Sequence, residues 1–284
     1  MKLVTLAMTM ALVVTSTPFS TPAVDAQQSG PSNVDGLHRP YDEILDLYVR
    51  DGLVYYFALK QERAKFDRYV AALGDVSAET VKSWPRERQI AYWLNAYNAF
   101  VLRTVIDAYP IRGTAPGYPA NSIRQIPGAF ERRQFRAGGR SLTLDQIEKD
   151  VLGEMGDARV LLALGRGAVG SPRLKSEAYT AERLDSQLDT MVSELVTNRD
   201  LVFVDIPNEH LSVNPIFSWR EQIFTNALAA TAPAVYATRS PLERAVLSLI
   251  EAGLVPNEAA FLRKNTFRMT FNDFDWKLND LTGR

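Results

Sequence analysis

The chain is first distinguished by residue types that it lacks. None of its 284 residues is cysteine, and its histidines number only 2, His38 and His210. A chain without cysteine forms no disulfide, has no thiol nucleophile and builds no thiolate zinc site. The histidines are too few for a multi-histidine metal site. Any site must therefore use carboxylates, amides, hydroxyls and arginines, and we expect neither a metal nor a cofactor.

An excess of one charge is also lacking. The formal net charge is −1, which is too close to neutral to indicate nucleic-acid binding or electrostatic attachment to a membrane. We therefore expect no nucleic-acid partner.

Hydrophobic runs long enough to span a bilayer are missing as well. The apolar run 3–14 follows Lys2 and is shorter than the roughly 20 residues that a membrane-spanning helix needs. Val24 and Ala26 fit the small-x-small pattern of a cleavage site. These features predict a signal peptide, residues 1–26, and an exported chain, periplasmic or secreted, with no transmembrane segment after cleavage. The alternative is an uncleaved membrane anchor.

What the sequence does contain is a strongly hydrophobic helical stretch, residues 90–106, with the sequence IAYWLNAYNAFVLRTVI. Trp93, Tyr97 and Phe100 recur at helical spacing on one face, and apolar residues fill most of the others. A helix that is apolar nearly all round is buried on most of its sides. At about 1.5 Å per residue it is about 25 Å long. We predict that the rest of the domain is built around this helix.

Two asparagines interrupt this helix, Asn95 and Asn98, at a spacing of i, i+3. Asparagine is a poor helix former, and a buried amide without a partner costs roughly 1–3 kcal/mol. Both side chains must therefore bond to something. They either tie a crossing loop to the helix or line the wall of a ligand pocket.

The remaining pattern predicts one domain, residues 41–284, preceded by a flexible leader, residues 27–40. Helices are expected at 41–49, 64–73, 143–152, 180–195, 216–228 and 240–252, and strands at 53–59, 135–137, 140–142, 201–206 and 267–271. Thr143 and Gln146 form a capping box that opens the helix at 143, Thr180 caps the helix at 180–195, and Gly138-Gly139 joins the strands 135–137 and 140–142 in a tight hairpin. The 216–228 helix is interpreted as core packing, and His210 as part of an exposed turn. Long helices with few, short, mostly antiparallel strands indicate a single α+β domain in which other helices surround the long buried central helix.

Several stretches occur in an order that resembles a known family. They are IAYWLNAYNAFVL, GGRSLTLDQIE, DARVLLAL, Ser171-Pro172, EAYTAERLDSQLD, IFSW and DFDWKLN. Their order and wording resemble the domain of unknown function 547 family over about residues 41–279. The resemblance implies a related fold and a site beside the central helix. It implies no reaction, since the family's chemistry is not established.

The chain departs from the family's pattern at three places. Members commonly have histidine where this chain has Lys149 and again where it has Leu161, and often have cysteine in the loop that here reads GRGAVGS. The resemblance thus implies thiol or metal chemistry that this chain lacks. A surviving site would use the other polar residues near that loop. The candidate pocket consists of Asn95, Asn98, Glu148, Arg159, Arg166 and Ser171.

Each polar group near this pocket has a functional interpretation and a structural one. Glu148 is either a buried base, or an acceptor for Arg159, or a solvated helix carboxylate. Arginines around the predicted hairpin either hold an anion, such as a phosphate or an envelope polymer, or form an exposed basic hairpin. These arginines are Arg132, Arg133, Arg136 and Arg140. The glycines at 165, 167 and 170 match a dinucleotide-binding pattern, but Ser171-Pro172 follows instead of a helix, so we treat the match as coincidence.

Two functions fit these observations. The first is an exported binding or structural envelope protein that lacks the family's cysteine and histidine groups and takes an unknown small-molecule or envelope ligand. The second is a hydrolase or transferase that uses carboxylate, amide and arginine groups in a pocket beside the central helix.

Overall fold

A hydrophobic helix through the core organises the structure, a computed structural model that describes residues 35–283. This helix, α5 (Arg86–Ala108), contains the hydrophobic stretch 90–106 and begins directly after Pro85. Trp93, Tyr97 and Phe100 are 3%, 0% and 0% exposed. Because apolar residues occupy every face of α5, the helix is stable only where other elements cover it on all sides. The predicted buried central helix is confirmed.

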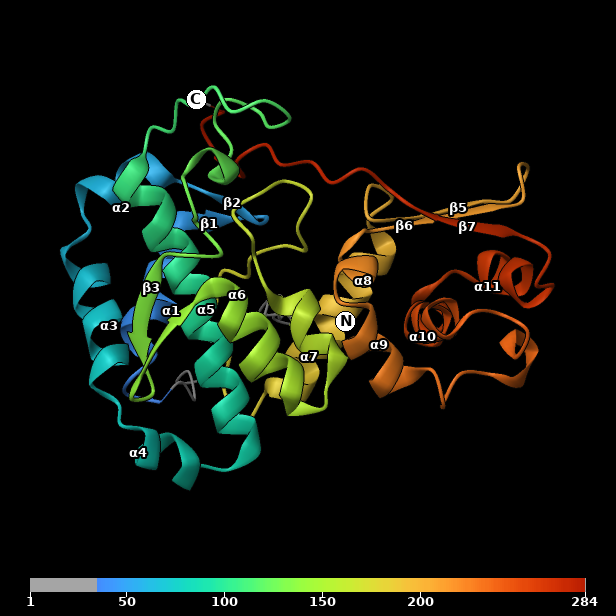
Figure 1. Ribbon diagram of the computed structural model, residues 1–284, viewed down its shortest axis with the longest axis horizontal. Helices are drawn as coiled ribbons and strands as arrows, with labels where there is room; N and C mark the ends of the chain where they lie inside the picture. Colours follow the sequence, from blue (N-terminus) through green and yellow to red (C-terminus); the bar gives the residue numbers. More distant parts are fainter. Residues whose placement is uncertain (1–34, 284) are drawn as a thin grey trace, which may run out of the picture. The chain divides into compact units, whose positions relative to one another are not determined.

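Short helices and a small hairpin precede α5 in the chain (Figure 1). They are α1 (Arg39–Tyr48), β1 (Val49–Arg50), β2 (Leu53–Val54), α2 (Tyr56–Gln61), α3 (Ala64–Asp75) and α4 (Ala78–Ser83). Helix α1 begins inside the segment predicted as a leader, and the run predicted as a strand at 53–59 divides into β2 and α2.

After α5 the chain forms a second hairpin and a series of tight helical turns. These elements are η1 (Ile123–Gln125), β3 (Gln134–Ala137), β4 (Arg140–Thr143), α6 (Leu144–Gln146), η2 (Ile147–Leu152), η3 (Gly153–Met155) and η4 (Ala158–Ala163). The predicted hairpin forms because Gly138 and Gly139 adopt positive φ angles of 55° and 69° at its turn. Thr143 and Gln146 make the predicted capping box at the start of α6.

The last part of the chain combines helices with a small sheet. Its elements are α7 (Leu184–Thr197), β5 (Val202–Asp205), β6 (His210–Val213), α8 (Ile216–Trp219), α9 (Glu221–Leu228), η5 (Ala234–Tyr236), α10 (Pro241–Ile250), η6 (Glu251–Gly253), α11 (Pro256–Arg263) and β7 (Arg268–Phe271). The sheet order is β5-β6-β7, antiparallel between β5 and β6 and parallel between β6 and β7. The other two sheets are antiparallel hairpins. The predicted α+β class with mostly antiparallel strands is confirmed.

Three local predictions are wrong because side-chain contacts that the apolar pattern does not reveal decide them. The segment predicted as one helix at 216–228 is broken at Arg220, which has φ −125° and ψ 35°. Thr180 does not cap α7; its hydroxyl accepts from the Arg183 N–H in a separate turn, while its own N–H donates to Gln187. His210 is in β6 and not in an exposed turn, and its Nε2 lies 2.7 Å from the hydroxyl of Thr270 on β7.

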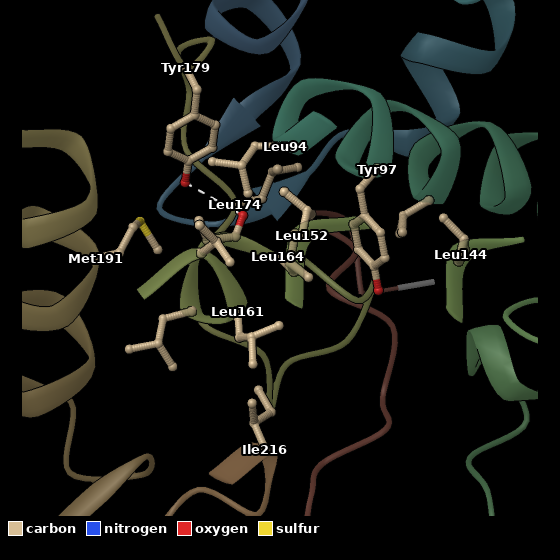
Figure 2. Close-up of a cluster of buried hydrophobic side chains, with 14 of the residues drawn as sticks. Leu94, Tyr97, Leu144, Leu152, Leu161, Leu164, Leu174, Tyr179, Met191 and Ile216 are labelled. Carbon is tan, nitrogen blue, oxygen red and sulfur yellow. Dashed lines mark hydrogen bonds between the residues drawn. The ribbon is translucent and has the colours of Figure 1, made fainter. Parts of the chain in front are cut away.

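The turn at 165–171 lies directly against α5. Gly167 has φ +66°, and a Cβ there would lie 3.3 Å from methyl groups of Val101 and Ile123. Glycine is therefore needed both for the backbone conformation and for the close approach to the helix. The segment just before the turn, η4, is also buried, and Figure 2 shows Leu161 between Met191 of α7 and Ile216 of α8.

Within residues 35–283, no helix combines the length and the hydrophobicity that crossing a membrane requires. The predicted signal peptide, 1–26, and most of the leader, 27–40, lie outside the described residues.

Candidate functional site

Both asparagines of α5 bond to the backbone of crossing segments. Asn95 donates from Nδ2 to the carbonyl of Tyr179 and accepts from the N–H of the same residue, both at 2.9 Å. Asn98 donates to the carbonyl of Ala163 at 3.0 Å and accepts from the N–H of Gly165 at 2.8 Å. Each amide thus satisfies one buried carbonyl and one buried N–H. This arrangement fits the interpretation of the asparagines as ties between helix and loop.

The charged centre of the structure is a buried ion pair between Glu148 and Arg166. Their side chains are each 3% exposed, and Arg166 Nη2 donates to Glu148 Oε1 at 2.6 Å. Tyr97 of α5 donates its hydroxyl to Glu148 Oε2 at 3.2 Å. Glu148 lies in η2, which is wound as a π-helix, a rare geometry that often occurs at functional sites. The interpretation of Glu148 as a solvated helix carboxylate is therefore wrong.

Arg220 reaches the same carboxylate from the break between α8 and α9. Its Nε lies 3.1 Å from Glu148 Oε1, and its Nη2 lies 3.5 Å from Asp145 Oδ1. Ending α8 at Trp219 turns the Arg220 side chain back toward η2, so the break in the predicted helix positions a charged residue.

The two carboxylates have pKa values shifted in opposite directions. Burial would raise the pKa of Glu148, but the guanidinium groups of Arg166 and Arg220 outweigh it and hold that pKa below the ordinary value. Burial raises the pKa of Asp145, and the nearby charge of Glu148 adds to this effect while Arg220 opposes it. Glu148 therefore stays ionised, and Asp145 holds its proton to higher pH than an ordinary aspartate.

Glu148, Arg166 and Asp145 line a pocket of about 240 Å³. We call it the Trp219 pocket; its lining residues are Arg124, Phe130, Asp145, Glu148, Arg166, Trp219, Arg220 and Trp276. Trp219 and Trp276 stack with ring centroids 5.7 Å apart and planes 12° apart. Arg124 lies over the rings of Trp276 and Phe130 at 4.6 Å and 4.5 Å. The pocket thus has an aromatic wall and a charged floor.

The structure places two of the predicted pocket residues away from this floor. Arg159 pairs with Asp157 at 2.8 Å, with Asp185 at 2.7 Å and with Asp189, so it does not bond to Glu148. These three aspartates accept the hydrogen bonds of its guanidinium group instead. The hydroxyl of Ser171 accepts from the backbone N–H of Arg166 at 3.0 Å, so it supports the turn that carries the arginine. Of the six predicted residues, only Glu148 and Arg166 line the Trp219 pocket.

Sequence reasoning missed the aromatic half of the pocket. Trp219 was assigned to core packing, yet it is 38% exposed. Trp219 ends IFSW and Trp276 lies in DFDWKLN, two of the short stretches that carry the family resemblance. A tryptophan in each of two such stretches was the available signal. Nothing in the sequence placed the two rings together.

The histidine positions implied by the resemblance are in unlike environments here. Lys149 is exposed, whereas Leu161 is 0% exposed among leucines of the core. Within residues 35–283, no group of three or more histidine, aspartate or glutamate side chains could hold a metal ion.

Fold and site together define an α+β domain with a long buried helix and an aromatic-walled, charged pocket beside it. Residues 81–196 match the family model described as protein of unknown function, DUF547. Over this segment the chain resembles the domain of unknown function 547 family; the match includes α5, Glu148 and Arg166, whereas Trp219, Arg220 and Trp276 lie beyond it. No curated protein and no solved structure matches the chain.

Proposed function

We propose that this chain is an exported binding protein whose site is the Trp219 pocket. Its ligand is a small molecule with a flat ring and an anionic group. The observation that carries the proposal is the position of the exposed Trp219 ring, which shares one cavity with three guanidinium groups, those of Arg124, Arg166 and Arg220. Ligand pockets typically combine apolar walls with a few convergent polar groups in this way.

The aromatic wall supports a ring that stacks on Trp219 from outside. Trp219 and Trp276 are 5.7 Å apart between centroids, and a third ring between them would need about 7 Å because aromatic rings stack at about 3.5 Å or more. The guanidinium of Arg124 already covers Trp276. The exposed surface of Trp219 is therefore the place for a ligand ring, and stacking there contributes about 0.5–1.5 kcal/mol beyond the buried area.

The charged floor supports an anionic group on the same ligand. Arg166 is committed to Glu148, and Arg124 pairs with Glu131, but the Nε atoms of Arg124 and Arg220 are buried and make no hydrogen bond among the described residues. Arg220 Nε lies near Glu148 without donating to it in good geometry. A carboxylate bound at the pocket would accept from these two arginines, since guanidinium groups recognise carboxylates bidentately.

Benzoate tests the site, with the uncharged benzyl alcohol as its comparison. By isothermal titration calorimetry we expect benzoate to bind more tightly than benzyl alcohol. Trp219→Ala should raise the dissociation constant of benzoate by about threefold to tenfold, because one ring stack is lost. Phe203→Ala is the matched control, because Phe203 is also 38% exposed and lies outside the pocket. Unchanged affinity in Trp219→Ala, or no binding of benzoate at millimolar concentration, contradicts the proposal.

A hydrolase or transferase is the second candidate, because Asp145 and Glu148 line one pocket with pKa values shifted in opposite directions. Such a pair can supply an acid and a base side by side. An ester of benzoate, incubated with the protein and then analysed by mass spectrometry, distinguishes the two functions. Ester that is recovered intact supports binding alone; ester cleaved by the wild type and spared by Asp145→Asn supports the enzyme.

Export rests on the N-terminal sequence. Lys2, the apolar run 3–14 and the small residues before Gln27 form the pattern of a cleaved signal. We expect protein recovered from the periplasm or the medium of an expressing bacterium to begin near Gln27 on N-terminal sequencing. Protein that stays in the cytoplasm with residues 1–26 intact contradicts export, and membrane-bound protein with those residues intact supports the anchor instead.

A further inference from the structure

A second cavity, of about 410 Å³, lies between α3, α5 and the strand β3. We call it the hairpin groove; its lining residues are Val70, Ala71, Gly74, Asp75, Phe100, Arg103, Arg133, Gln134, Phe135 and Arg136. It shares no lining residue with the Trp219 pocket. Figure 1 shows α3 beside β3. The two elements approach closely, since a Cβ on Gly74 would lie 3.3 Å from the Cβ of Arg136.

The floor of this groove is rigid and aromatic. Phe135 of β3 stacks on Phe100 of α5 with centroids 4.5 Å apart and planes 6° apart, and both rings are buried. The guanidinium carbon of Arg133 lies 5.4 Å from the centroid of the Phe135 ring. Arg133 lies directly before β3 and two residues from Phe135, so the backbone holds the arginine close to the floor.

Behind the floor, a network of ion pairs holds the arginines in place. Asp107 accepts from Arg63 at 2.6 Å, from Arg103 at 3.0 Å and from Arg133. Asp67 accepts from Arg63 at 2.8 Å and from Arg103 at 3.0 Å. Burial would raise the pKa of Asp107, but its hydrogen bonds from Arg63, Arg103 and Arg133 outweigh this and lower it. Three guanidinium groups therefore share two carboxylates, which leaves positive charge in excess.

Several guanidinium nitrogens at the groove remain available. Among the described residues, Arg103 Nη2 and Arg133 Nε and Nη1 donate no hydrogen bond, and the Arg136 side chain makes none. Arg136 also has no ion pair with any described residue. Asp75 is the only carboxylate that lines the groove. These donors come from α5, from β3 and from Arg133 just before that strand, and the ion pairs and the ring stack hold these segments together.

We propose that the hairpin groove binds a small phosphate-bearing molecule. Three guanidinium groups with unused donors match the several oxygens and the multiple charge of a phosphate or diphosphate group better than the two oxygens of one carboxylate. The site goes beyond the proposed function, because its residues and its ligand chemistry differ from those of the Trp219 pocket. A small ligand fits better than a long polyanion, since Asp75 lies in the groove and the net charge of the chain is −1.

Inorganic pyrophosphate tests the groove by isothermal titration calorimetry, with malonate as a dicarboxylate comparison. We expect pyrophosphate to bind more tightly than malonate and to weaken as potassium chloride is added. Arg136→Gln should raise the dissociation constant of pyrophosphate by about tenfold, as expected for the loss of a charge-assisted hydrogen bond. Arg136 is exposed and makes no ion pair with any residue from 35 to 283, so the substitution leaves the fold intact.

Arg140→Gln is the matched control, because Arg140 is an exposed arginine on the same hairpin that does not line the groove. Pyrophosphate affinity in this variant should stay within about twofold of the wild type, since Arg140 lies outside the groove and its exposed charge is screened by solvent. Equal losses in the two variants, or malonate binding as tightly as pyrophosphate, overturn the assignment. Benzoate binding at the Trp219 pocket should be the same in both variants, which keeps the two proposals separable.

Discussion

Replacing Arg166 by methionine should lower the free energy of unfolding by about 3–5 kcal/mol, the cost of leaving one partner of a buried ion pair uncompensated. The substitution removes the donor at 2.6 Å from Glu148 and leaves a carboxylate that is 3% exposed. Among the described residues, only Arg220, at the edge of the pocket, then pairs a positive charge with this carboxylate, beside the hydroxyl of Tyr97. Urea denaturation measures the effect as a lower midpoint with an unchanged slope.

Arg159→Met is the matched control for this experiment. Arg159 also contacts several carboxylates, but Asp185 and Asp189 are 85% and 66% exposed. Exposed pairs typically contribute up to about 1 kcal/mol, so this control should cost far less than Arg166→Met. In the double variant Glu148→Leu with Arg166→Met, much of the lost stability should return, because neither charge of the buried pair is then left without the other. Equal costs for Arg166→Met and Arg159→Met would contradict the buried pair.

The same pair gives the stability a defined pH dependence. The pKa of Glu148 is lowered in the folded protein from its ordinary value of 4.5. A group with a lowered folded-state pKa contributes stability that is present above its ordinary value and is lost as the pH falls through the folded-state value. Carboxylates are ionised at about pH 6 to 7. The difference in free energy of unfolding between wild type and Arg166→Met should therefore be largest there. It should decrease as the solution is acidified below pH 4.5.

Local sequence signals predicted the parts of the fold that depend on local physics. The apolar faces of α5, the glycine turn at 138–139 and the Thr143 capping box each act within a few residues, and each was predicted correctly. Arg220 shows the limit of such reasoning. The apolar spacing across 216–228 favours an unbroken helix, whereas contacts of Arg220 with Asp145 and Glu148 accompany a break there.

The candidate site was predictable to a similar extent. Glu148 and Arg166 were both named as candidates, because Glu148 adjoins Lys149, where the family commonly has histidine, and Arg166 lies in the loop where the family often has cysteine. Their pairing was not, since several acids and arginines lie close by in sequence and geometry alone selects among them. Asp157, only two residues away, captures Arg159. Trp219 and Trp276 come from distant stretches, so their stacking depends on the tertiary fold.

Replacing Asn98 by alanine should lower the free energy of unfolding by about 3 kcal/mol, because two buried backbone groups then lose their partner at roughly 1–3 kcal/mol each. These groups are the carbonyl of Ala163 and the N–H of Gly165, on either side of the point where the chain enters the turn at 165–171. Hydrogen exchange should locate the effect, with faster exchange at Gly165 than in α5.

Ligand binding then distinguishes a structural from a functional asparagine. Asn98 does not line the Trp219 pocket, so the folded Asn98→Ala protein should bind benzoate with the wild-type dissociation constant. Asn95→Ala should behave in the same way, because its two bonds to Tyr179 are of the same kind. A variant that keeps wild-type stability but loses benzoate would place the amide at the ligand instead. Lost stability with retained binding means that Asn98 holds the turn that presents Arg166 to the pocket and that Asn95 holds the segment at Tyr179, so that the buried helix contributes to the site through the backbone it positions.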